Sequence, residues 1–306
     1  MTTTALSFEN TTKVYGKYTA LKDVVLNIPQ GEIMALVGHN GAGKTTMMKL
    51  LLGLIRPTSG SVRVMDVDPA SSASSTVKRS LGFLPETVAF QHAMTGIEVM
   101  NFYGRLKRTD LSRNADLLDR VGLADAARNR VKTYSKGMRQ RLGLAQALLG
   151  DPKVMLLDEP TSGLDPALRR SFYDTISALK AEGVTVLLSS HALTELEIHV
   201  DKVAIMNKGQ LMATGNLDEL RANAHMPVRI RVRSSDVSAS DIASQLGGAE
   251  VSQINGHMVE FACSAQDKMI LIRRIAELGV AVTDMEIELP SLDQLYSHYR
   301  HEETPS

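Results

Sequence analysis

The chain has 306 residues, of which 43% are hydrophobic and 22% are charged. This length and composition suit roughly two folded domains with buried cores and exclude a disordered chain. The 34 Lys and Arg residues balance the 34 Asp and Glu residues, which argues against nucleic acid as a partner, since proteins that bind it usually carry a basic excess.

Cysteine usage and hydropathy indicate the compartment. Cys263 is the only cysteine in the chain, which excludes an internal disulfide framework and suits a reducing environment. The first residues lack the basic-then-apolar run of a signal peptide. No apolar stretch approaches the roughly 20 residues of a membrane-spanning helix. We therefore expect a cytoplasmic protein that works at a membrane only if a partner brings it there.

The first 220 residues alternate strand and helix patterns. Residues 1–30 predict short strands that end in a turn at 29–31. The apolar run at 32–38 predicts a buried strand, and a helix follows from Gly43 to about residue 55. Further along, the pattern predicts helices at 96–107, 114–122, 136–150 and 168–183, strands at 153–159, 184–190 and 202–215, and a loop at 71–75. Such alternation indicates an α/β domain on a largely parallel sheet, with a helix-rich segment inside it.

The pattern changes near Pro227, so we predict a domain at 1–222 and a second at 226–306. The second domain reads as a strand at 228–234, a short helix at 240–247 and a hairpin at 250–263 around Asn255 and Gly256, the strongest short hairpin signal in the chain. An amphipathic helix, a strand and a final helix capped by Ser291 complete it. The order β-α-β-β-α-β plus a helix predicts a small α+β domain of the ferredoxin-like type.

A glycine-rich loop between the strand at 32–38 and its following helix carries the strongest chemical signal. The loop matches the phosphate-binding pattern G-x-x-x-x-G-K-[ST] and continues into Thr46; its residues are Gly38, His39, Asn40, Gly41, Ala42, Gly43, Lys44 and Thr45. Backbone amides and the helix N-terminus would surround the phosphates of ATP. Lys44 would contact the β- and γ-phosphates, and Thr45 would bind Mg²⁺. We expect the Lys44 side chain to face solvent when no nucleotide is bound.

Two acidic residues end the strand at 153–159. In phosphate-loop ATPases, the acid in the position of Asp158 holds the Mg²⁺ shell. The next acid, Glu159, is placed to act as a general base on the attacking water. Such a pair alone would more often only hydrate a strand end, but its combination with the phosphate loop favours catalysis.

Four further motifs resemble those of ABC-type ATPases, in that family's order and spacing. The segment 134–141 resembles the signature motif, and 162–165 resembles the D-loop. His191 matches the switch histidine, and Tyr15 matches the aromatic residue that stacks on adenine. Alone, His191 reads as a strand-end histidine and Tyr15 as a half-buried strand aromatic. The resemblance covers about residues 6–215 and implies a phosphate-loop ABC ATPase domain with a helical subdomain.

The resemblance also implies roles for the residues of these motifs. Ser135, Lys136 and Gly137 of the signature and Asp165 of the D-loop would bind nucleotide. Because the signature helix lies outside its own phosphate loop in that fold, it would serve the nucleotide of a second copy, which implies a homodimer. Three positions depart from the family pattern. In the signature motif, Lys136 replaces a glycine and Met138 replaces a glutamine. Glu86 replaces the Q-loop glutamine, although a carboxylate cannot donate as an amide does.

The segments 38–55, 130–150, 227–232 and 290–299 resemble the NosF-type ATPases more narrowly. This resemblance implies a subunit on the inner face of the cell membrane, with a NosY-like integral permease and, through it, a NosD-like periplasmic protein as partners. Its ATP hydrolysis would power transport of copper or sulfur species for the copper site of nitrous-oxide reductase. The alternatives are an exporter ATPase for another substrate and a non-transport ABC ATPase. The 15 methionines read as core residues, not as a copper site in this subunit.

Overall fold

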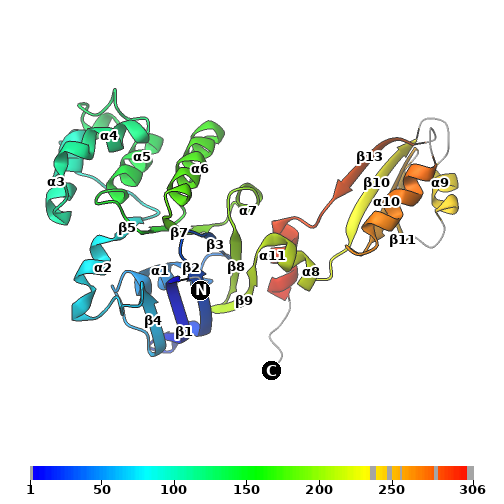
Figure 1. The fold of residues 1–306 in the computed structure, drawn as a ribbon, viewed down its shortest axis with the longest axis horizontal. Coiled ribbons are helices and arrows are strands. Elements are labelled where there is room, and N and C mark those ends of the chain that lie inside the picture. Colours follow the sequence, from blue (N-terminus) through cyan, green and yellow to red (C-terminus); the bar gives the residue numbers. More distant parts are fainter. Residues whose placement is uncertain (1–2, 235–238, 247–249, 256, 279–281, 302–306) are drawn as a thin grey trace. The chain divides into compact units, whose positions relative to one another are not determined.

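The computed structural model describes residues 3–234, 239–246, 250–255, 257–278 and 282–301. The chain divides into two compact units, with the division between Asn216 and Leu217 (Figure 1). We predicted the division at 222–226. The structure instead groups α8 (Leu217–Asn223) with the second unit, in which it contacts α11 (Leu292–His301). None of the described helices is both long enough and apolar enough to cross a membrane.

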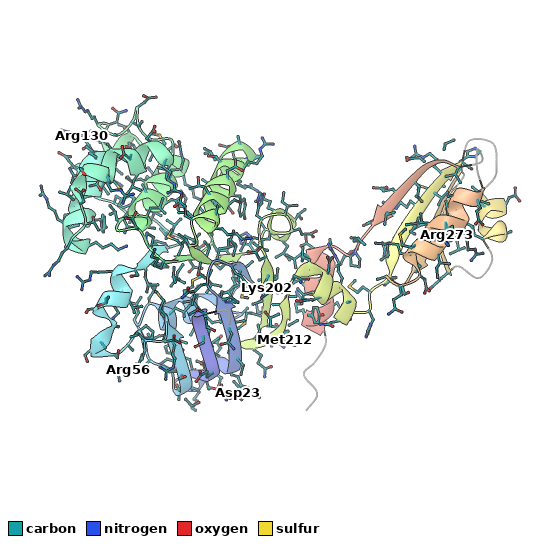
Figure 2. The ribbon with its side chains drawn as sticks, in the orientation of Figure 1. Asp23, Arg56, Arg130, Lys202, Met212 and Arg273 are labelled. Atoms are coloured by element: carbon teal, nitrogen blue, oxygen red, sulfur yellow. The ribbon has the colours of Figure 1, made fainter. Side chains whose placement is uncertain are left out.

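A six-stranded sheet is the centre of the first unit. Its strand order is β5-β6-β7-β3-β8-β9, in which β9 alone is antiparallel to its neighbour. The bounds are Leu81–Leu84, Val154–Leu157, Thr185–Ser190, Ile33–Val37, Lys202–Asn207 and Gln210–Gly215 in that order. Two of the inner strands, β3 and β6, consist entirely of apolar residues, as expected where helices or a second sheet cover both faces. Lys202 (Figure 2) pairs with Glu32 at 3.1 Å and fastens the starts of two neighbouring strands. The predicted parallel α/β sheet is confirmed.

A second sheet in this unit is antiparallel, with the order β2-β1-β4. Its strands are β2 (Tyr18–Pro29), β1 (Thr4–Tyr15) and β4 (Ser59–Val64). The prediction of short strands before residue 30 was wrong, because β1 and β2 each extend over 12 residues. Bulges in their register let such long strands bend. Apolar residues of both sheets and of the first helix form one buried core.

Eleven α-helices and three short 3₁₀ turns accompany the strands in the described chain (Figure 1). In the first unit the helical segments are α1 (Lys44–Leu51), η1 (Ser72–Ser74), α2 (Ser75–Arg79), α3 (Gly96–Lys107), η2 (Leu111–Arg113), α4 (Asn114–Arg120), η3 (Val131–Thr133), α5 (Lys136–Ala147), α6 (Pro166–Ala181) and α7 (Leu193–Leu196). The contacts of α3, α4 and α5 with one another form the predicted helical subdomain. Residues 71–75, predicted as a loop, form η1 and the start of α2 instead.

The second unit contains a four-stranded antiparallel sheet in the order β11-β12-β10-β13. Its elements after α8 are β10 (Val228–Ser234), α9 (Ala239–Gln245), β11 (Glu250–Asn255), β12 (Met258–Cys263), α10 (Lys268–Glu277), β13 (Val282–Glu288) and α11. This connectivity is the split β-α-β arrangement of ferredoxin-like domains, as predicted. Ser291 caps α11 by accepting from the backbone amide of Gln294 at 3.3 Å. The predicted hairpin pairs β11 with β12, although Gly256 lies outside the described residues.

Candidate functional site

The phosphate loop lies between β3 and α1, as the sequence predicts. Gly43 precedes the first helical residue with a φ of 109°, in the region that glycine alone occupies freely. A Cβ atom there would lie 2.7 Å from the side chain of Leu21, and one on Gly38 would lie 2.7 Å from the carbonyl oxygen of Met206. These two glycines are therefore required by close packing as well as by the shape of the loop.

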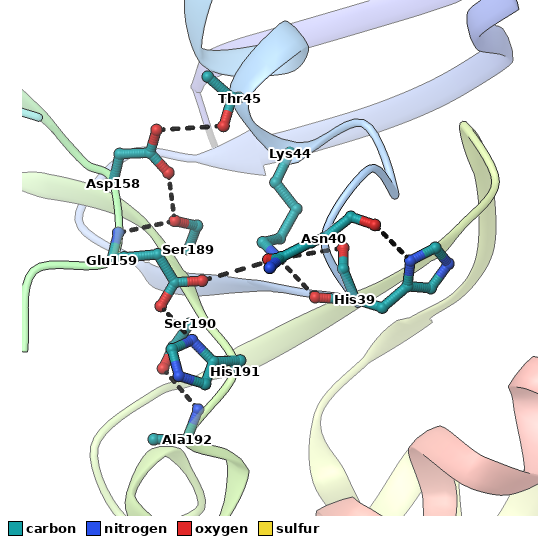
Figure 3. A network of polar contacts seen from close by, with 11 residues as sticks. His39, Asn40, Lys44, Thr45, Asp158, Glu159, Ser189, Ser190, His191 and Ala192 are labelled. Carbon is teal, nitrogen blue, oxygen red and sulfur yellow. Dashed lines mark hydrogen bonds and ion pairs between the residues drawn. The ribbon is translucent and has the colours of Figure 1, made fainter. Parts of the chain in front are cut away.

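Lys44 is buried, with 7% of its surface exposed. Its ammonium donates to the carbonyl oxygens of Gly38 and, at 3.4 Å, His39, and lies 3.7 Å from Oε1 of Glu159 (Figure 3). The expectation of a solvent-facing lysine was wrong. The loop's own carbonyl groups and an acidic neighbour hold the cation, because a buried charge requires such partners.

Asp158 follows β6 and is held by two hydroxyl groups. Thr45 donates to its Oδ2 at 3.2 Å, and Ser189 donates to its Oδ1 at 2.6 Å. The Oγ of Ser189 also accepts from the backbone amide of Glu159 at 2.8 Å. The sequence analysis missed Ser189, although its place at the end of the strand next to β6 was a usable signal. A hydroxyl and a carboxylate at the edge of the phosphate loop are hard oxygen donors, the kind that Mg²⁺ with a phosphate requires, so these residues fit that ion.

Glu159 connects the phosphate loop to His191 (Figure 3). Its Oε2 lies 2.8 Å from Nδ1 of His191, while its Oε1 faces Lys44. Only 8% of Glu159 is exposed, and its φ is 46°, an unusual value for a residue with a side chain. The bond from its amide to Ser189 maintains this conformation, which directs the carboxylate toward the phosphate loop. The two residues predicted as catalytic are thus in direct contact.

A hollow of about 640 Å³ lies over these groups. It is lined by Tyr18, Ala20, His39, Asn40, Gly41, Ala42, Gly43, Lys44, Thr45, Thr46, Glu86, Asp158, Glu159 and His191. Glu86, at the predicted Q-loop position after β5, therefore reaches the site. Tyr15 is absent from this lining; Lys13 covers its ring, with 5.0 Å between the ammonium and the ring centre. The aromatic residue at the hollow is Tyr18, three positions later, which the sequence analysis missed.

The signature and D-loop residues begin two helices outside this hollow. The hydroxyl of Ser135 accepts from the amide of Met138 at 3.2 Å and caps α5. The carboxylate of Asp165 accepts from the amide of Leu168 at 2.9 Å and caps α6. In the described part of the chain, neither these caps nor Lys136 and Gly137 line the hollow. One copy therefore does not bring the signature motif to its own phosphate loop.

Two contacts join the signature helix to the segment after β6. The Lys136 ammonium lies against Gly163 of the D-loop, where it occupies the space that a side chain would need. Lys136 is exposed in this position. The buried Gln140 donates to the carbonyl oxygen of Pro160 at 2.9 Å. The sequence analysis did not identify Gln140, and a polar residue on an otherwise packed helix face was the available signal.

Comparisons with known proteins agree with this geometry. The family model of ABC transporters matches residues 21–162. The daunorubicin resistance ATP-binding protein DrrA3 of Streptomyces coeruleorubidus is 33% identical over 97% of this chain and 96% of its own length. The linearmycin resistance ATP-binding protein LnrL of Bacillus subtilis is 27% identical over 95% of this chain and 96% of its own length.

Solved structures extend the comparison to the fold. An ATP-binding subunit of an ABC transporter covers 72% of this chain and 92% of its own, with a TM-score of 0.66 and 29% identity. The dimeric bacterial cassette MJ0796 covers 69% of this chain and 98% of its own, with a TM-score of 0.64 and 25% identity. The chain belongs to the ATP-binding, ATP-hydrolysing subunits of the ABC transporter family.

Proposed function

We propose that Glu159 is the general base of ATP hydrolysis and that His191 orients it. The observation that carries this proposal is the contact of both carboxylate oxygens, one with His191 at 2.8 Å and one near Lys44 at 3.7 Å. A buried base that is held at both oxygens loses little entropy when it takes a proton from the attacking water. Lys44 binds the β- and γ-phosphates once ATP replaces the carbonyl groups that hold its ammonium.

Thr45 and Asp158 would hold Mg²⁺ together with the phosphates. The ion, when bound, neutralises the charge that develops on the transferred phosphoryl group. Ser189 fixes the Asp158 carboxylate from the opposite side, at 2.6 Å, and the same hydroxyl fixes the Glu159 backbone. One serine therefore positions both the metal-binding acid and the base.

The active unit in this proposal is a homodimer. Ser135 and Gly137 lie at the N-terminus of α5, where a hydroxyl and the first backbone amides of a helix suit a γ-phosphate. Because Ser135 and Gly137 do not line the hollow of their own copy, the phosphate that they bind belongs to a second copy. The cassette MJ0796 has been solved as a dimer, which supports testing a dimer for this chain. We further propose that residues 226–306 hold the two copies together or adjust turnover.

The membrane partner is an integral permease, and Glu86 lies in the loop that we propose to contact it. For the cargo, we propose export of a small organic molecule. Its support is that the relatives spanning nearly the whole chain, DrrA3 and LnrL, carry names of drug resistance. The second candidate is copper or sulfur delivery for nitrous-oxide reductase with NosY-like and NosD-like partners, which rests on the sequence resemblance of the segments ending at 299. In the described ranges, no three His, Cys, Asp or Glu side chains gather as a metal site.

The test is co-purification of the tagged subunit with its permease from detergent extracts of the native membrane. ATP hydrolysis by the complex is then measured with daunorubicin-like drugs and, separately, with copper ions. Drug-dependent stimulation supports export. Stimulation by copper alone would replace that proposal with the second candidate, and the absence of any membrane protein in the complex would contradict both.

A further inference from the structure

Arg169, in the first turns of α6, contacts two segments that both lead away from the catalytic pair. Its Nε donates to the carbonyl oxygen of Leu164 in the D-loop at 2.8 Å. Its Nη1 pairs with Oε1 of Glu195 on α7. The planar guanidinium group can hold two acceptors at a fixed angle, which an ammonium group cannot do.

The two segments begin at Glu159 and His191, which are themselves joined at 2.8 Å. On one side, the amide of Ser162 donates to the carbonyl oxygen of Glu159 at 3.2 Å, so the D-loop turns directly away from the base. On the other side, α7 begins two residues after His191 and carries Glu195. Arg169 therefore joins the D-loop to α7, and the Glu159–His191 bond joins the two residues after which these segments begin.

The surroundings of this ion pair strengthen it. Arg169 and Glu195 are 33% and 32% exposed, so water screens them less than a fully exposed pair. Tyr173 is a buried residue of the same helix, and burial raises the pKa of its hydroxyl to about 12. The negative charges of Glu195 and Glu159 act on this pKa in the same direction as burial, and the Thr161 side chain and the positive charge of Arg169 oppose them.

We infer that Arg169 is a positioning residue that joins the D-loop and the switch-histidine segment into one mechanical unit and so keeps Glu159 aligned with His191. The inference rests on the proposed role of Glu159 as the base. Since a displacement of about 1 Å at a reacting group can cost about 100-fold in rate, loss of one contact of Arg169 would slow the chemical step. It would leave ATP binding unchanged, because Arg169 does not line the hollow.

The experiment compares Arg169→Gln with Arg120→Gln in the full-length chain. Arg120 is the matched control, because it forms an arginine–carboxylate pair with Glu182 at 2.6 Å, at the opposite end of α6 from Arg169. We expect Arg169→Gln to lower kcat about 10-fold or more while the dissociation constant of ATP stays within about twofold. Arg120→Gln should change neither. Thermal unfolding of both variants shows whether either loss comes from misfolding.

A double-mutant cycle with His191→Ala separates positioning from general destabilisation. If Arg169 acts through the Glu159–His191 contact, Arg169→Gln should lower kcat by less than about twofold once His191 is absent. Arg169→Lys keeps the charge but cannot hold both acceptors, so its kcat should fall between those of the wild type and Arg169→Gln.

Three results would overturn the inference: a wild-type kcat in Arg169→Gln, an undiminished loss in the His191→Ala background, or an equal loss in Arg120→Gln. Failure of the proposed function is a separate outcome, since it would appear as wild-type hydrolysis by Glu159→Gln. A wild-type rate in Arg169→Gln beside an inactive Glu159→Gln contradicts only the positioning role.

Discussion

Replacement of Glu159 by Gln isolates the proton acceptor from the rest of the site. Gln has the same length and the same Cβ, so the unusual backbone conformation and the contact with His191 at 2.8 Å should survive. Gln can hold a water molecule but cannot remove its proton. Hydrolysis should therefore fall by about two to four orders of magnitude, the usual contribution of a general base.

The same replacement should strengthen ATP binding. At 3.7 Å from Lys44, the Glu159 carboxylate attracts the ammonium with a gross energy of about 4 kcal/mol at an effective dielectric constant of about 20. Phosphate must compete with this attraction, and the carboxylate also repels it. Since hydration and the other contacts of Lys44 cancel most of the gross energy, we expect about tenfold tighter binding, which corresponds to about 1.4 kcal/mol.

Calorimetry with Mg-ATP measures the affinity, and phosphate release measures the rate. Light scattering after size exclusion then tests the composite site, because uncleaved ATP should hold two copies together through Ser135 and Gly137. ADP lacks the γ-phosphate and should not have this effect. Wild-type hydrolysis would remove Glu159 as the base, weaker ATP binding would refute the competition for Lys44, and an inactive variant that stays monomeric would refute the composite site.

The remaining predictions concern three other features. Lys44→Ala should weaken ATP binding by at least about 100-fold, as expected for loss of a charge-assisted phosphate contact, and unchanged affinity by calorimetry would contradict the assignment. A chain ending near residue 225 should remain folded and bind ATP, because the hollow is lined entirely by residues before 192 in the described chain; loss of all binding would show that the first unit depends on the second. Burial lowers the pKa of Lys107 from 10.5 to about 8. Between these two pH values, Lys107 binds more protons in the unfolded chain than in the folded chain. The contribution of this group to the free energy of unfolding therefore increases as pH rises. Denaturant unfolding should therefore show the wild type gaining stability over Lys107→Met across that range, and a pH-independent difference would contradict the shift.

The sequence by itself determined the chemistry and most of the fold class. The phosphate-loop pattern, the strand that ends in Asp158 and Glu159, and the alternation of strand and helix patterns all depend on local spacing, which the chain displays directly. The β-α-β-β-α-β order of the second unit was also readable, since each element has its own period of hydrophobic residues. Local signals of this kind require no knowledge of which segments meet.

The tertiary structure alone decided which residues contact one another across the sheet. Tyr18 and not Tyr15 lines the hollow because the long β1–β2 pair, which bends at its bulges, sets which residues of this segment face the phosphate loop. Ser189 holds both acids because β6 and β7 are parallel neighbours, with Leu157 beside Leu188. Lys44 is buried because carbonyl groups of its own loop and Glu159 surround it. Arg169 joins the D-loop to Glu195, which lies 26 residues after Arg169 in the chain. These contacts depend on strand order and on the closing of loops, and neither leaves a periodic trace in the sequence.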